Sequence, residues 1–134
     1  MTVRTEVPNV APWGASMRYS RAVRIGPLIE VSGTTAVDAA GQVVAVGDVA
    51  GQVRRCFEIV EEALEELGAS LSDVIRTRLY VTDTSTWKDA GAAHDEVFEG
   101  WPAPASSAVG IASLIHPDLL VEVEVTAYLP ESTS

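Results

Sequence analysis

The hydrophobic pattern is most regular near the C-terminus, where residues 119–129 read LLVEVEVTAYL. Apolar and polar residues alternate here, and successive side chains of a β-strand point to opposite faces of a sheet. The pattern predicts a strand with a buried valine face and an opposite face that carries Glu122 and Glu124. Charged side chains are mostly exposed, so Glu124 is expected in solvent. Glu122 lies deeper in the run and is the better candidate for a pocket or a subunit interface.

Four other segments have strand character. Residues 18–25 and 28–32 flank Gly-Pro, a pair that supplies turn geometry, so these two segments are expected to form a hairpin. Residues 74–81 and 107–114 are the third and fourth β-prone runs. A further turn is expected at 38–41, where the sequence is DAAG.

Two segments show helical spacing of apolar residues. The first lies between Asp48, a good N-cap, and Gly68, a good helix stop, and predicts a helix over 49–67. Its outer face is rich in glutamate, as is typical of a solvated helix surface. The second helix is expected over about 86–98, before two nearby prolines.

The order of these elements predicts an α+β fold in which two helices lie on one face of a mainly antiparallel sheet. A length of 134 residues suits a single domain. The N-terminal residues 1–16 contain two prolines and a glycine and are expected to be irregular. The domain is then expected over 17–130, with a C-terminal tail at 131–134.

Charge and cysteine content narrow the possible partners and location. Lys and Arg number 9 against 19 Asp and Glu, which opposes binding to phosphate backbones and anionic membranes. No nucleic-acid or membrane partner is therefore expected. The only cysteine, Cys56, cannot form an internal disulfide, which favours a reducing compartment. With no signal-peptide pattern and no run of about 18 apolar residues, a cytoplasmic location is expected.

Common catalytic motifs are not recognisable. His94, His116 and Cys56 lack the spacing of zinc sites, so neither a metal nor another cofactor is expected. Ser32 precedes a glycine but lacks the G-x-S-x-G context of a nucleophilic serine. His94 falls on the second predicted helix, where a packed or half-exposed ring is favoured over a catalytic one.

Four short segments together resemble the RidA/YjgF family, also called L-PSP endoribonuclease-like, over residues 17–129. The segments are Tyr19-Ser20-Arg21-Ala22, Val31-Ser32-Gly33-Thr34, Pro104-Ala105-Ser106-Ser107 and Val121-Glu122-Val123-Glu124. None is specific alone, and the resemblance rests on their order and intervals. Gly68-Ala69 and the run at 73–83 also look like the glycine-ended helix and the central strand of the family.

The resemblance implies a chorismate-mutase-like subunit that assembles as a homotrimer, with small-molecule clefts between neighbouring subunits. It also implies hydrolysis of reactive enamines or imines to 2-oxo acids and ammonia. Five residues converge on the cleft in the active deaminases: a tyrosine, a serine, an asparagine, an arginine and a glutamate. Tyr19, Ser32 and Glu122 match three of them, whereas the asparagine position falls on Gly91 and the arginine position on Ser106.

The missing arginine changes the expected substrate. A guanidinium binds a carboxylate in a bidentate way, and such charge-assisted bonds contribute about 3 kcal/mol, whereas Ser106 offers one neutral hydrogen bond. A 2-imino acid is therefore expected to be a poor substrate. Arg76 and Arg78 are expected to form ion pairs at a surface or interface, and not to replace the missing arginine. Glu122 remains the candidate base, with Tyr19 to hold a polar ligand atom.

Two functions remain open. In the first, the protein is a cofactor-free hydrolase of C=N bonds with Glu122 and Tyr19 as catalytic residues. The expected substrate contacts are then Ser32, Thr34, Gly91, Ser106 and Ser107. In the second, the same clefts bind or sense a small metabolite without turnover. A ribonuclease, which the alternative family label suggests, is disfavoured because the acidic chain has no basic stripe.

Overall fold

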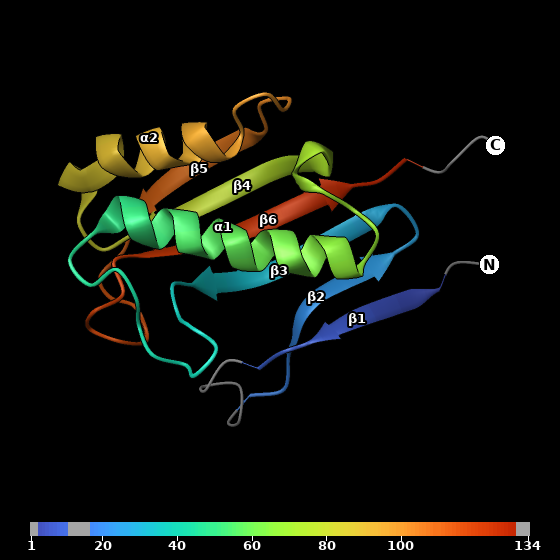
Figure 1. Ribbon diagram of the computed structural model, residues 1–134, viewed down its shortest axis with the longest axis horizontal. Helices are drawn as coiled ribbons and strands as arrows, with labels where there is room; N and C mark the ends of the chain where they lie inside the picture. The colour runs from blue at the N-terminus through green and yellow to red at the C-terminus, as the bar shows by residue number, and fades with distance from the viewer. Residues whose placement is uncertain (1–2, 11–16, 131–134) are drawn as a thin grey trace.

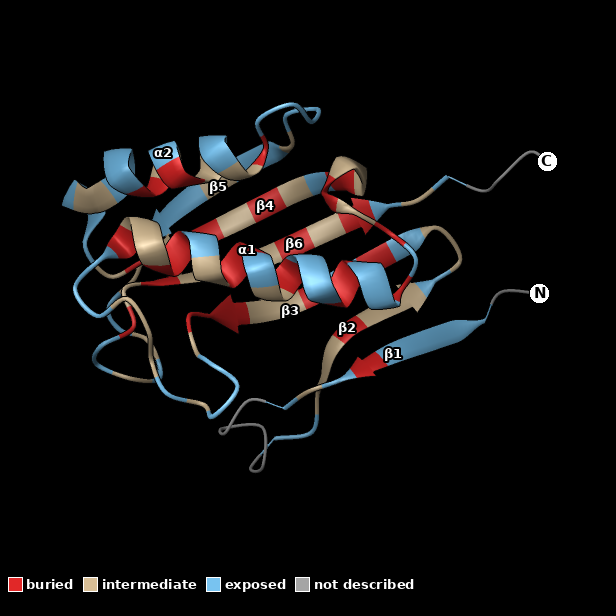
Figure 2. Cartoon of the chain, viewed as in Figure 1, coloured by how far each residue is buried: buried red, intermediate tan, exposed pale blue. Residues whose placement is uncertain are grey.

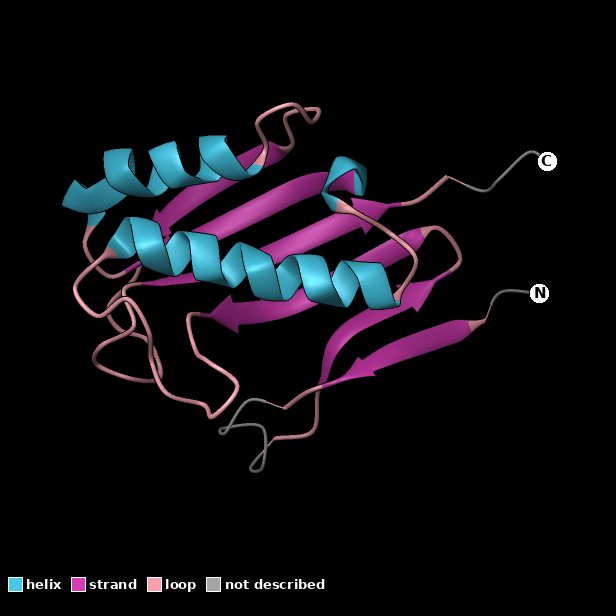
Figure 3. Ribbon diagram, in the orientation of Figure 1, coloured by secondary structure: helices cyan, strands magenta, loops and turns pink. Residues whose placement is uncertain are grey.

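The computed structural model describes residues 3–10 and 17–130, which form one mixed sheet with two helices on one face (Figures 1 and 3). The strand order is β1-β2-β3-β6-β4-β5. The elements are β1 (Arg4–Pro8), β2 (Ser20–Ile25), β3 (Leu28–Thr35), α1 (Val49–Glu66), η2 (Leu71–Asp73), β4 (Val74–Val81), η3 (Thr84–Thr86), α2 (Trp87–Val97), β5 (Ala105–Gly110) and β6 (Val121–Tyr128). The predicted α+β class and the hairpin of β2 and β3 are confirmed.

Strand β1 corrects the expectation that residues 1–16 are irregular. Its residues pair antiparallel with β2, from Arg4 opposite Ile25 to Val7 opposite Ala22. An edge strand has one partner, and only Val7 of β1 is buried, so the hydrophobic alternation that marks inner strands is absent. Pro8 ends the strand, a position where its missing N–H is tolerated. Residues 11–16 and 131–134 lie outside the described parts of the chain.

Strand β5 also differs from its prediction, because it begins at Ala105 and ends at Gly110, four residues before the expected end. It is the other edge of the sheet and pairs parallel with β4, whereas the other strand pairs are antiparallel. Beyond Gly110 the chain leaves the sheet for a turn in which His116 Nδ1 accepts a hydrogen bond from Asp118 N at 3.0 Å.

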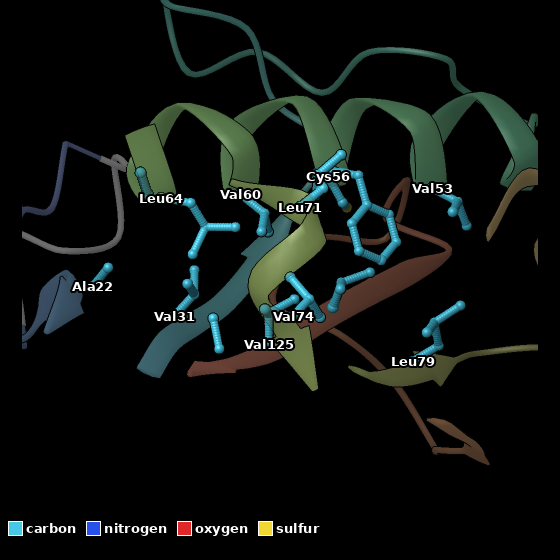
Figure 4. Packing of buried hydrophobic residues seen from close by; sticks show 14 of the residues in the cluster. Ala22, Val31, Val53, Cys56, Val60, Leu64, Leu71, Val74, Leu79 and Val125 are labelled. Carbon is cyan, nitrogen blue, oxygen red and sulfur yellow. The ribbon is translucent and has the colours of Figure 1, made fainter. Parts of the chain in front are cut away.

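The core lies between α1 and the sheet (Figures 2 and 4). The predicted valine face of β6 is confirmed, since Val121, Val123 and Val125 are at most 2 % exposed. They pack in one cluster with Val53, Phe57, Val60 and Leu64 of α1. Asp48 caps α1 as predicted, with Oδ1 accepting from Gly51 N at 2.9 Å. The helix ends at Glu66, and Gly68 follows with a φ of +82°, a conformation that favours glycine.

Gln52 of α1 is a buried polar side chain that joins two loops. Its Nε2 donates to Asp118 O at 2.9 Å, and its Oε1 accepts from Leu120 N at 2.8 Å. The same Nε2 also approaches Val44 O at 3.3 Å. The side chain is fully buried, so these bonds hold the entry to β6 against the N-terminal half of α1.

In residues 3–10 and 17–130, no helix lies over the other face of the sheet (Figure 3). Because side chains alternate along a strand, the residues between the buried valines of β6 point to this face, among them Glu122 and Glu124. We call it the open face. Neither α1 nor α2 is long and apolar enough to cross a membrane.

Candidate functional site

A β-bulge in β3 shapes the chain next to Glu122. Val31 pairs with Val125 and Thr34 with Val123, so three steps along β3 match two steps along β6. The extra residue lies in the pair Ser32-Gly33, opposite Glu124. Bulges bend a strand and redirect side chains, and they are common beside active sites.

Because Gly33 has no side chain, it leaves the space that the Glu122 carboxyl group occupies. A Cβ built on Gly33 would lie 2.9 Å from Glu122 Cδ and 3.0 Å from Oε1, closer than van der Waals contact allows. The carboxyl group therefore lies directly against the backbone of the bulge. Any side chain at position 33 displaces it.

Arg21 holds the bulge from β2 and was not identified from the sequence. Its Nη2 donates to Ser32 O at 2.9 Å and to Gly33 O at 2.7 Å. Ser32 Oγ donates to Ser20 O at 2.7 Å, a second link between the two strands. Arginine occurs at this point of the chain within the Tyr19-Ser20-Arg21-Ala22 segment, but nothing local in the sequence indicates that it bonds carbonyl groups eleven and twelve residues away.

Glu122 and Glu124 differ in their hydrogen bonds. Glu124 is half-buried and accepts a hydrogen bond from the Tyr80 hydroxyl, which corrects the expectation that it lies free in solvent. Glu122 is also half-buried, and no described residue donates a hydrogen bond to it. Burial raises its pKa, the charge of Glu124 adds to the rise, and Arg21 opposes it. Glu122 is thus a basic carboxylate that is available to a ligand or a neighbouring chain.

Tyr19 and Ser32 share a hollow on the side of the β1–β2 edge. Its volume is about 880 Å³, and Arg4 and Glu6 also line it. The structure thus brings Tyr19 to Ser32, and Ser32 through the bulge to Glu122. Tyr19 and Ser32 line this hollow, whereas Glu122 is not among its lining residues.

Thr34 lies on the face of the sheet opposite to Glu122. It is fully buried on the helix-covered face, and its Oγ1 donates to Ser32 O at 2.8 Å. The reason is the bulge, which turns Thr34 to the same face as its partner Val123. This buried position opposes the expectation that Thr34 contacts substrate.

Ser106 and Gly91 lie elsewhere, on β5 and α2. Ser106 is exposed, and its Oγ accepts a hydrogen bond from Thr77 Oγ1 at 2.7 Å. Thr77 Oγ1 is also 2.9 Å from His94 Nε2. Gly91 is half-buried in the middle of α2, and a Cβ there would meet no atom within 4 Å. There is open space where the resemblance places an asparagine.

Ser106 and Ser107 face opposite sides of the sheet. Ser106 pairs with the buried Thr77, on the helix-covered face, whereas Ser107 pairs with Arg78 on the open face. Ser107 Oγ accepts from Arg76 Nη2 at 2.9 Å, so this arginine is bonded to a serine of the neighbouring strand. The two serines therefore cannot line the same wall of one cleft.

Within one chain the two halves of the expected site do not meet. Glu122 lies on the open face of β6, and Ser106 lies on the helix-covered face of β5, with β4 between these strands (Figure 1). Side chains on opposite faces of a sheet cannot bind one small molecule together. A cleft that uses both needs a second copy of the chain.

Two other candidates have structural roles in the described parts of the chain. Cys56 is fully buried and donates to Thr34 O at 3.3 Å, and burial raises the pKa of its thiol far above the usual range. The His94 ring packs against Phe57 and Phe98, with centroid distances of 5.6 and 4.8 Å. Burial lowers the pKa of His94, as expected for a packed ring. No cluster of three or more potential metal ligands occurs among the described residues.

Comparison with known proteins places this geometry in a family. The family described as Endoribonuclease L-PSP matches residues 9–129. A RutC family protein of Pyrococcus abyssi is 34% identical over 110 residues, which cover 82% of this chain and 85% of that protein. An uncharacterized protein of Streptomyces coelicolor is 33% identical over 122 residues, or 91% of this chain and 90% of its own.

Solved structures agree with the sequence matches. A Mycobacterium tuberculosis protein, described as a member of the YjgF/YER057c/UK114 family, superposes with a TM-score of 0.84 at 43% identity, covering 95% of this chain and all of that one. The YjgF gene product of Escherichia coli gives a TM-score of 0.81 at 29% identity, covering 92% of this chain and 98% of its own. The chain belongs to the Endoribonuclease L-PSP family, that is, to the RidA/YjgF family, and has its chorismate-mutase-like fold.

Proposed function

We propose that the protein is a cofactor-free hydrolase that acts on the C=N bond of small polar molecules, with Glu122 as the general base. The observation that carries this proposal is the state of the Glu122 carboxyl group. It is half-buried against Gly33, its pKa is raised, and no described residue donates a hydrogen bond to it. A structural carboxylate on the same face, Glu124, is bonded to Tyr80 instead.

The chemistry needs only water and proton transfers. Glu122 accepts a proton from water as the water oxygen bonds to the imine carbon, and the protonated Glu122 carboxyl group returns this proton to the nitrogen. Glu122 then transfers the hydroxyl proton of the resulting amino alcohol to its nitrogen, so that the C–N bond breaks, ammonia leaves and a carbonyl product forms. A base is most effective when its pKa approaches the working pH, and the raised pKa of Glu122 is a shift in this direction.

Tyr19 is the proposed partner of Glu122. It lines the same hollow as Ser32, and its phenol can hold the nitrogen or an oxygen of the substrate. Arg21 has a positioning role, because its bonds to Ser32 O and Gly33 O fix the bulge on which the carboxylate lies.

The proposed site is a cleft between copies of the chain in a homotrimer. Glu122 and Ser106 lie on opposite faces of one sheet, so a neighbouring copy has to bring its α2–β5 edge to Glu122. The open face, which no helix covers, is the surface available for that assembly. Apolar side chains on it, among them Leu28 and Tyr128, are 45% and 47% exposed in the single chain.

The proposed substrate is neutral or carries its polar groups away from the C=N carbon. Ser106 offers a hydroxyl group where a 2-imino acid would need a cationic clamp. The space beside Gly91 leaves room for a larger substituent. We expect slow or undetectable turnover of 2-iminobutanoate and 2-iminopropanoate. The lone, buried Cys56 fits a reducing compartment, and we propose a cytoplasmic location.

Binding without turnover is the second candidate, and the departures at Gly91 and Ser106 favour it. The same cleft would then hold or sense a small metabolite. The two functions differ only in whether Glu122 removes a proton from water.

A turnover assay separates them. Imines and enamines with neutral and charged substituents are generated in place by an amine or amino-acid oxidase, and their loss and the release of ammonia are followed. We expect turnover of a neutral imine by the wild type and at least a hundredfold loss in Glu122→Gln. Glu124→Gln is the matched control and should retain activity. No turnover across the panel, or equal loss in both variants, contradicts the hydrolase.

A further inference from the structure

Three polar side chains form a continuous line from the core to the β5 edge. His94 Nε2 is 2.9 Å from Thr77 Oγ1, and Thr77 Oγ1 donates to Ser106 Oγ at 2.7 Å. Thr77 is fully buried, His94 is half-buried and Ser106 is exposed. The line therefore ends on a surface that another molecule can reach.

Counting protons fixes the direction of this line. A threonine hydroxyl has one proton, and the Thr77 proton is used toward Ser106. The second contact of Thr77 Oγ1 must then be an accepted bond, so the Nε2 of His94 carries the proton. Ser106 accepts from Thr77, so its own proton points elsewhere.

We propose that the His94–Thr77–Ser106 line orients the Ser106 hydroxyl as an outward hydrogen-bond donor, so that the β5 edge selects ligands with an acceptor oxygen, such as a carbonyl or amide. This inference rests on the ligand cleft of the proposed function and adds the class of group that binds there. His94 and Thr77 are positioning residues and Ser106 is the ligand contact. Successive bonds of one direction strengthen one another, so Ser106 is a better donor than an isolated serine.

The choice of threonine at position 77 supports a role for the hydroxyl group. Its neighbours on the same face of β4, Leu79 and Val81, are apolar and buried, and valine would fit the same space. A buried hydroxyl is unfavourable unless it is bonded, and Thr77 has both bonds it needs.

The other groups around His94 do not replace this contact. Helix α1 contributes Phe57, and Phe98 beside the ring directly follows α2. Asp95 of α2 contributes a charge that acts on the His94 pKa against the effect of burial. Thr77 is thus the hydrogen-bond partner of the ring among the described residues.

The tautomer of His94 tests the direction of the line without any ligand. The chain has two histidines, so a His116→Gln variant assigns the ¹⁵N signals of the His94 ring. We expect the Nε2–H tautomer in the wild type and in Thr77→Ser, and a mixed or Nδ1–H tautomer in Thr77→Val and in Ser106→Ala. In Ser106→Ala the Thr77 proton is free to turn toward His94. An Nδ1–H tautomer in the wild type overturns the proposal.

Ligand binding tests the specificity. The probes are 2-oxobutanamide, which is neutral and has acceptor oxygens, and butan-2-ammonium, which has none. We expect the wild type to prefer 2-oxobutanamide, Thr77→Val to weaken it about fivefold, as for one lost hydrogen bond, and Thr77→Ser to restore it. No binding of 2-oxobutanamide by the wild type, or unchanged binding in Thr77→Val, overturns the proposal. If the tautomer and binding results hold and no imine is turned over, the hydrolase fails and this inference stands.

Discussion

The Glu122 carboxyl group lies so close to Gly33 that a methyl group at position 33 would come within 2.9 Å of its Cδ. Glu122 lies near the start of β6, and Gly33 lies in the bulge of the neighbouring strand β3. The carboxylate occupies the space that a side chain at position 33 would fill, and no described residue donates a hydrogen bond to it. A residue that is unremarkable in the sequence thus determines where the proposed base lies.

Gly33→Ala should therefore reduce activity more than stability. The atoms in the way belong to the end of a flexible side chain, so the fold can adapt, and we expect a loss of about 1 kcal/mol or less in the free energy of unfolding. A base displaced by about 1 Å can lose on the order of a hundredfold in rate. Denaturant unfolding and imine turnover measure the two effects.

A double-mutant comparison checks the cause. In the Glu122→Gln background, Gly33→Ala should reduce turnover little further, because the displaced group is already inactive. Fully additive losses would show that Gly33 acts through something other than Glu122.

The raised pKa of Glu122 predicts a pH-dependent difference in stability. At pH values between 4.5, the ordinary pKa of a glutamate, and the raised pKa of Glu122 in the folded chain, the folded chain binds more protons than the unfolded chain. The stabilising contribution is fully present below pH 4.5 and is lost as the pH rises through the folded value. Glu122→Gln should thus be as stable as the wild type, or more stable, at pH 7. This gain should vanish toward acid pH.

Thermal unfolding at a series of pH values, with the assembly state held constant, makes this measurement. Glu124→Gln is the control, because it removes a carboxylate that accepts a hydrogen bond and should not be stabilising. A Glu122→Gln variant that is less stable than the wild type at pH 7 would mean that the charged form has a partner in the assembly.

Ser106→Arg should introduce or raise activity on 2-imino acids. An arginine at this edge can bind the substrate carboxylate through two charge-assisted bonds, and about 1.5–3 kcal/mol corresponds to roughly tenfold to a hundredfold. Gly91 limits the gain, because the asparagine of the family pattern is still missing. Adding Glu122→Gln should abolish the new activity with little loss of ligand binding, because the base acts when water loses its proton. Retained activity in the double variant would make Glu122 a structural residue.

The assembly should be a homotrimer with shared clefts. Light scattering in dilute neutral buffer should give three times the 14.2 kDa mass of the chain. Sharing can be tested by mixing two inactive variants, Glu122→Gln and Ser106→Trp, after unfolding and joint refolding. Clefts that combine an intact Glu122 from one copy with an intact Ser106 from another should restore part of the activity. A single-chain mass, or no restoration from a properly assembled mixture, contradicts the shared cleft.

Gln52→Leu should destabilise the chain by about 1–3 kcal/mol, because it removes the hydrogen bonds that the fully buried Gln52 side chain makes with Leu120 N and Asp118 O. Gln42→Leu, at an exposed position, is the control and should change stability by less than about 0.5 kcal/mol. Chemical denaturation of both variants measures the difference. Equal effects would show that Gln52 does not hold the loops.

The sequence predicted the elements with strong periodicity and missed those without it. The α1 helix and the β6 strand each bury one complete face, so their apolar residues recur at regular intervals. Strand β1 buries only Val7 and has no such signal. The same holds for the candidate site. Glu122 could be identified because it lies in an alternating run, whereas the role of Arg21 could not, because it depends on carbonyl groups of another strand. The buried position of Thr34 depends on a bulge that the sequence did not reveal.

The bulge at Ser32-Gly33 also limits how this chain can vary in length. Side chains alternate between the two faces of a strand, and the extra residue of the bulge shifts this alternation by one position for all later residues of β3. Thr34 points to the core because three steps along β3 match two along β6, so the deletion of one residue would leave Thr34 inward but remove the bulge against which Glu122 lies. Losing two residues would place Thr34 directly after Val31 and so turn it to the open face. Substitutions can therefore change side chains of this site while the bulge stays in place, whereas a deletion at this point removes the backbone against which Glu122 lies.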